Sequence, residues 1–69
     1  MNISIELLKD YCEFRNYDLE NKIIKGYKLI DNVVYIKWTS IKDENITGEH
    51  WASIIELLSF VYMKLIKIN

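Results

Sequence analysis

The sequence predicts an α+β domain with an N-terminal helix, an antiparallel β-hairpin and a long C-terminal helix packed on the sheet. Two observations lead to this prediction. Apolar residues recur at helical spacing near both ends of the chain, and two β-prone runs lie between them, separated by only two turn-forming residues. At 69 residues the chain has room for one domain, so residues 1–69 are expected to fold as a single unit.

The N-terminal helix is expected over about residues 4–16. Ser4 is a suitable N-cap, and Glu6 lies in the first turn, where a carboxylate interacts favourably with the helix dipole. Asn16 tolerates the left-handed conformation that often ends a helix. The apolar residues that recur at helical spacing are Leu7, Leu8, Tyr11, Cys12 and Phe14.

The hairpin is expected to join strands at 23–30 and 33–41. Asp31 and Asn32 between them both tolerate the positive φ of a type I′ turn. A two-residue loop would place Lys25 opposite Trp38, and alternation along the strands then predicts a core face and a more polar outer face. The expected core face carries Ile23, Tyr27, Leu29, Val34, Ile36 and Trp38, and the outer face carries Ile24, Lys28, Ile30, Val33, Tyr35, Lys37 and Thr39.

The C-terminal helix is expected from about Gly48 to Lys67, with Thr47 as its N-cap; a very short third strand at Ile46 is an open alternative. Its apolar arc is roughly twice the width of the 100° stripe on an ordinary surface helix. The helix is too short to span a membrane, because its apolar part from Trp51 to Ile66 has only 16 residues and about 20 are needed. The helix is therefore either the centre of a small core or covered on one side by another molecule.

An exposed patch that includes Phe60 is expected on this helix, because one small sheet and one short helix cannot cover so wide an apolar arc. Small domains often complete their cores by oligomerisation. We therefore expect either a homodimer through the C-terminal helix or an interface with a different protein.

Composition excludes several classes of protein. Nine basic and ten acidic residues give a net charge of −1, which argues against a general nucleic-acid binder. A single cysteine excludes a disulfide framework, and with no visible signal peptide it favours the cytoplasm. Ile, Lys and Asn, which have AT-rich codons, make up 26 of the 69 residues and favour a phage or a low-GC bacterium as the source.

The chain lacks a recognisable set of catalytic residues, so no enzyme and no cofactor are expected. His50 is interpreted as an exposed residue in a first helical turn, and Cys12 as a small buried apolar residue. A structural zinc site needs four Cys or His ligands, and the chain has two such residues, so no metal is expected either.

These features favour a small, non-enzymatic protein–protein interaction domain. In size and composition the chain resembles small phage or mobile-element products that bind and block a bacterial host or defence protein, as anti-CRISPR proteins do, although no motif identifies a family. Two alternatives stay open: a small dimeric nucleic-acid-binding or regulatory protein that uses the basic hairpin, and a subunit of a larger assembly. The residues expected to contact a partner are Lys28, Tyr35, Lys37, Trp51, Phe60 and Tyr62.

Overall fold

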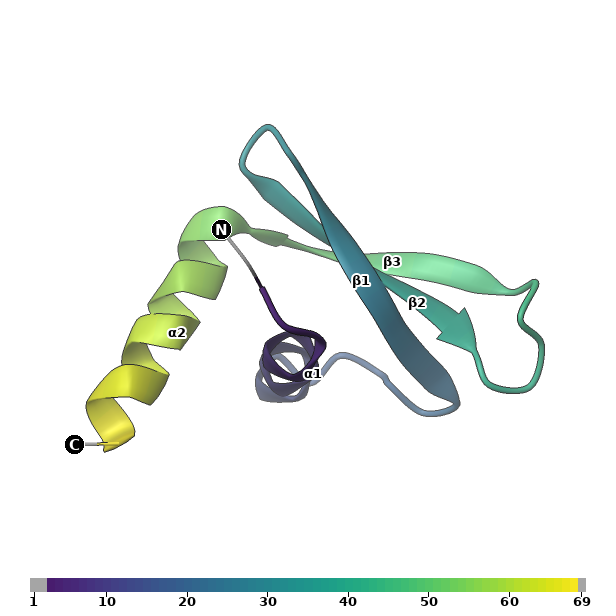
Figure 1. Cartoon of the computed structure of the whole chain (residues 1–69), viewed down its shortest axis with the longest axis horizontal. Coiled ribbons are helices and arrows are strands. Elements are labelled where there is room, and N and C mark those ends of the chain that lie inside the picture. Colours follow the sequence, from purple (N-terminus) through teal and green to yellow (C-terminus); the bar gives the residue numbers. More distant parts are fainter. Residues whose placement is uncertain (1–2, 69) are drawn as a thin grey trace.

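The computed structural model describes residues 3–68 and has the α+β architecture that the sequence predicts (Figure 1). A three-stranded antiparallel sheet of order β1-β2-β3 lies between two helices in the sequence, and the C-terminal helix packs against the sheet. In chain order the elements are α1 (Ile5–Phe14), β1 (Lys22–Ile30), β2 (Val33–Ser40), β3 (Thr47–Ser53) and α2 (Ile54–Ile68).

The ends of α1 follow the local signals in the sequence. The Ser4 side chain accepts a hydrogen bond of 3.1 Å from the backbone N–H of Leu7, which satisfies one of the free donors of the first turn. Asn16 follows the helix in the left-handed conformation, with φ of 59°. The predicted N-cap and the predicted terminating residue are both confirmed.

The hairpin turn is also confirmed, but the register changes further along β1. Asp31 and Asn32 have φ of 50° and 67°, and Ile30 pairs with Val33 as expected. A β-bulge between Ile24 and Gly26 then makes Ile24, rather than Lys25, the partner of Trp38.

The bulge exchanges the faces of the residues that precede it. Ile24 is 4% exposed and belongs to the core, whereas Ile23 is 47% exposed. The predicted assignments of these two residues were therefore wrong, because one extra residue in a strand turns all earlier side chains to the opposite face. Leu29, also predicted for the core, is exposed near the end of the edge strand β1.

The third strand is longer than the sequence suggested. β3 covers seven residues, most of which the sequence predicts as the start of the last helix, and α2 begins only at Ile54. Pairing with β2 accounts for the difference: Ala52 lies opposite the buried Val34, and Trp51 lies opposite Tyr35. The predicted helix start at Gly48 was wrong because these cross-strand contacts outweigh the weak local preference of the segment.

The core lies between one face of the sheet and the two helices. Its buried side chains come from all five elements, and α2 closes the core at one end of the sheet (Figure 1). The radius of gyration is 12.4 Å, whereas a compact domain of this length would have about 11 Å. The buried residues are Leu8, Tyr11, Cys12, Ile24, Val34, Ile36, Ala52, Leu57 and Phe60.

The ring of Trp38 leaves no room for a side chain at Gly48 in β3. A Cβ atom at position 48 would overlap with Cζ2 of Trp38, so the indole would have to move. We expect Gly48→Ala to lower the free energy of unfolding by about 1–3 kcal/mol, which is typical of overpacking. Urea unfolding measures this change, with Thr47→Ala at the exposed neighbouring position as the control. Unchanged stability of Gly48→Ala would contradict this close approach.

Candidate interaction surfaces

One side of α2 packs on the rest of the chain through aromatic contacts with α1. Phe60 is only 8% exposed. Its ring centroid lies 5.5 Å from that of Tyr11 and 4.9 Å from that of Phe14. The expectation that Phe60 would lie in an exposed patch was wrong, because these two rings of α1 enclose it.

Polar contacts hold α2 in the same orientation against α1. The ammonium of Lys64 pairs with the carboxylate of Asp10. Glu56 at the start of α2 accepts a hydrogen bond of 3.3 Å from the Tyr11 hydroxyl, and its Oε2 lies 3.6 Å from Nη1 of Arg15. These exposed pairs contribute little energy individually. Together they span both halves of α2 and keep its opposite side turned away from the core.

That opposite side, which we call the outward face of α2, is apolar and exposed. Ile55 is 71% exposed and Tyr62 is 64% exposed. A shallow hollow of about 390 Å³ lies on this face, and the described residues that line it carry no charge. Contiguous apolar patches of this kind commonly mark contact sites. The outward face consists of Ile55, Leu58, Ser59, Tyr62, Met63, Leu65 and Ile66.

A second surface lies on the sheet, on the side away from the core. Lys28, Tyr35 and Trp51 are aligned across the three strands, and Lys37 lies opposite Glu49 in the next row. Four of the six residues predicted to contact a partner therefore share this surface, which we call the outer sheet face.

The outer sheet face combines aromatic rings with more basic than acidic side chains. Trp51 is 68% exposed. The Nζ of Lys28 lies 5.3 Å from the centroid of the Tyr35 ring and 3.3 Å from Oε2 of Glu49. Glu49 offsets only one of the lysines here, because Lys25 and Lys37 line the same hollow, so this side of the sheet keeps a modest positive charge.

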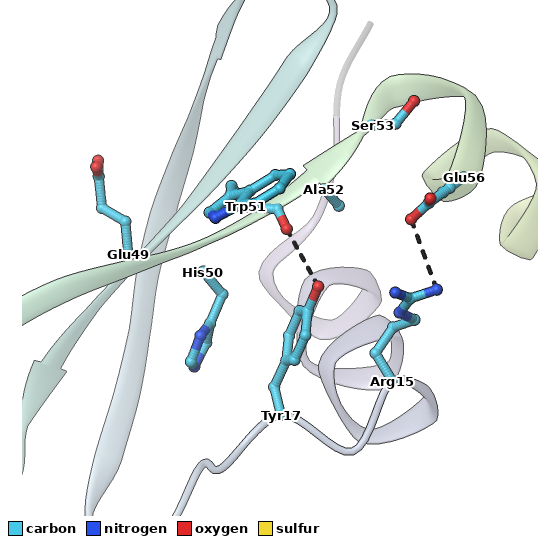
Figure 2. Close-up of a pocket in the computed structure, with 8 residues that line it drawn as sticks. All are labelled: Arg15, Tyr17, Glu49, His50, Trp51, Ala52, Ser53 and Glu56. Carbon is cyan, nitrogen blue, oxygen red and sulfur yellow. Dashed lines mark hydrogen bonds and ion pairs between the residues drawn. The ribbon is translucent and has the colours of Figure 1, made fainter.

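A pocket of about 410 Å³ separates the end of α1 from β3 (Figure 2). The ring of Tyr17 stacks on His50 at 4.7 Å between centroids, and its hydroxyl donates a 3.1 Å hydrogen bond to the carbonyl of Trp51. The Glu49 side chain points away from this pocket (Figure 2). His50 is half-buried on β3, so its predicted exposure in a helical turn was wrong. Its buried Nε2 has no hydrogen-bond partner among the described residues.

The described residues that carry reactive groups are dispersed or buried. No three His, Cys, Asp or Glu residues within the described part of the chain lie close enough to hold a metal ion. Cys12 is fully enclosed, and burial raises the pKa of its thiol to about 11. Burial likewise raises the pKa of Tyr11 to about 12. The Cys12 thiol is therefore protonated near neutral pH and is a weak nucleophile.

The buried thiol leads to a prediction for alkaline stability. Because the folded state raises the pKa of Cys12 above its ordinary value, the stabilisation is complete below about pH 9 and is lost as the pH rises towards 11. We expect the wild type to lose about 2 kcal/mol more than Cys12→Ala between pH 8 and 11. Urea unfolding across this range measures the difference. Parallel stability curves for the two proteins would contradict the prediction.

Comparison with known proteins identifies no relatives: no family model, no curated protein and no solved structure matches the chain. Among residues 3–68, no helix is both long enough and apolar enough to cross a membrane. The two surfaces are therefore the features of the molecule from which a function can be inferred.

Proposed function

We propose that this chain is a small protein-interaction domain and that the outward face of α2 is its contact surface. The supporting observation is the uncharged apolar hollow on a helix whose other side is already packed. Burying this face against another protein would remove apolar area from water at about 25 cal/mol per Å². Tyr62 at its centre belongs to a residue type that is enriched at interface hot spots.

The proposal extends to an inhibitor of a bacterial host or defence protein, acting in the cytoplasm. Support comes from the small size of the chain and from its high content of Ile, Lys and Asn, the residues with AT-rich codons. The charge pattern adds to it, because the segment 22–42 has a net charge of +4 and lies between acidic segments. Such a pattern can orient a partner of complementary charge during association.

Photo-crosslinking tests this proposal directly. We would replace Tyr62 with p-benzoylphenylalanine and irradiate the protein, both purified and in a bacterial lysate. Glu44, in the exposed loop between β2 and β3, is the matched control position. A discrete adduct with one polypeptide at position 62, and none at position 44, is expected. No adduct at position 62 in either sample would overturn the proposal.

Nucleic-acid binding is a second candidate function, and the alignment of Tyr35 with Trp51 on the outer sheet face favours it. Exposed aromatic rings beside lysines can stack on the bases of a single strand while the lysines contact phosphates. Titration with a single-stranded oligonucleotide at several salt concentrations tests this function. Binding that weakens steeply with salt, and weakens further in Lys28→Ala and Lys37→Ala, would support it. Salt-independent or absent binding would exclude it.

A further inference from the structure

The outward face of α2 has the spacing of a coiled-coil seam. Ile55, Ser59, Tyr62 and Ile66 follow one another at intervals of four, three and four residues, which is the spacing of a and d positions in a heptad. Leu58 and Leu65 fall at the flanking g positions, and Glu56 and Met63 fall at the e positions. The remaining b, c and f positions are the more buried ones. Leu57 and Phe60 belong to the core, and Val61 and Lys64 are half-buried.

The hollow on this face has the composition of a coiled-coil hole. Such a hole is formed by four residues of one helix and accepts one side chain, the knob, from the facing helix. Residues i, i+3, i+4 and i+7 form it here, namely Ile55, Leu58, Ser59 and Tyr62, with Met63 beside them. Ser59 is the smallest of these residues, so the space lies over it. The largest exposed side chain on the same face is Tyr62, which suits the role of the knob.

We propose that a second copy of this chain occupies the hollow, with the two α2 helices antiparallel and Tyr62 of each copy inserted beside Ser59 of the other. The proposal rests on the proposed function and names the partner of the same surface. A host protein would then bind the dimer through the outer sheet face, which this pairing leaves open. A two-fold axis between positions 60 and 61 generates this pairing. It also places Ile55 of each copy opposite Ile66 of the other, so the seam is complementary to itself.

Side-chain size favours the antiparallel arrangement over a parallel one. A parallel pair would place Ser59 opposite Ser59 and Tyr62 opposite Tyr62, which leaves a void in one layer and crowding in the next. The antiparallel pair places a large residue opposite a small one in both central layers. The helix dipoles are also opposed in this arrangement, so the like-charged ends of the two helices stay apart.

The size of the face reaches the lower end of the range for stable dimers. Six half-exposed apolar side chains contribute on the order of 600 Å² per chain, and a standard interface buries about 800 Å² per partner. Charge does not oppose the contact, because the seam itself is uncharged and Glu56 is the one charged residue at its flanking positions. The nearest acidic group, Glu56, is already paired with Arg15.

Oligomeric state and disulfide trapping together test the proposal. Light scattering after gel filtration is expected to give twice the chain mass of 8.3 kDa at micromolar concentration. For the register, we would prepare Ile55→Cys and Ile66→Cys separately, with tags of different size, and oxidise them alone and mixed. The mixture is expected to form the cross-variant disulfide at least about fivefold more than either variant forms its own dimer.

The controls distinguish the dimer proposal from the proposed function as a protein-interaction domain. Glu44→Cys, in a loop away from α2, should not form the disulfide, and the wild type checks that the enclosed Cys12 does not react. Self-crosslinking of each single variant would indicate parallel helices, and a monomeric mass would exclude the dimer; either result overturns the proposal. In the monomeric case, an adduct between position 62 and a different polypeptide would leave the proposed function intact, whereas no adduct would refute both.

Discussion

Replacing Phe60 with alanine is expected to lower the free energy of unfolding by about 3–5 kcal/mol, the cost of deleting a buried aromatic ring. Phe60 is the residue through which α2 contacts both Tyr11 and Phe14 of α1. Small domains are stable by only about 5 kcal/mol. The variant should therefore be largely unfolded at 37 °C.

Thermal and urea unfolding followed by circular dichroism measure this effect. Phe14→Ala is the matched control, because it deletes the same ring from the same aromatic cluster at a position that is 52% exposed. We expect the control to lose less than half as much stability, since less apolar area returns to water. An equal loss in both variants would show that Phe60 is no better packed than Phe14.

Local signals in the sequence were sufficient for the first helix and the hairpin turn. Ser4 and Asn16 act through hydrogen bonds and backbone angles within a few residues of themselves. Asp31 and Asn32 define the turn for the same reason. Each feature depends on its immediate neighbours, so sequence alone predicts it.

Features that depend on distant segments were not predicted. The bulge before Gly26 serves the packing of Ile24 in the core. An isolated glycine inside a strand is its one local signal, but such a glycine does not show which neighbouring side chain the core will take. The strand at Thr47–Ser53 forms because β2 offers an unpaired edge. In the sequence, the one local signal for this strand is the alternation of Glu49 and Trp51 with the smaller Gly48 and Ala52. The apolar residues that follow at helical spacing concealed this alternation.

For the candidate surfaces, too, the sequence predicts what depends on local residues and not what depends on distant segments. The sequence predicted correctly that the last helix carries more apolar surface than one side can bury. Periodicity could not show which side would be buried, because that depends on where α1 lies. Phe60 was therefore assigned to the surface in error, while Tyr62 is exposed as expected. The later start of α2 moved Trp51 to the outer sheet face, beside Tyr35.

Exchanging the side chains of Ser59 and Tyr62 is expected to break and then restore the proposed dimer. Tyr62→Ser removes the knob from both copies and should weaken dimerisation at least about 100-fold. Ser59→Tyr fills the hollow that receives the knob and should weaken dimerisation to a similar extent. In the double variant each new tyrosine faces a new serine across the antiparallel pair, so its Kd should return to within about tenfold of the wild-type value.

Sedimentation equilibrium measures the three dissociation constants, and circular dichroism verifies that each variant is folded. Tyr35→Ser, which alters the outer sheet face, is the control and should leave the Kd unchanged. Dimerisation of the double variant recovers only in the proposed register. In that register position 59 of one copy lies opposite position 62 of the other, so the new tyrosine becomes the knob and the new serine provides the hollow. Persistent loss of dimerisation in a folded double variant would refute this register, and full-strength dimerisation by either single variant would refute the knob and the hollow themselves.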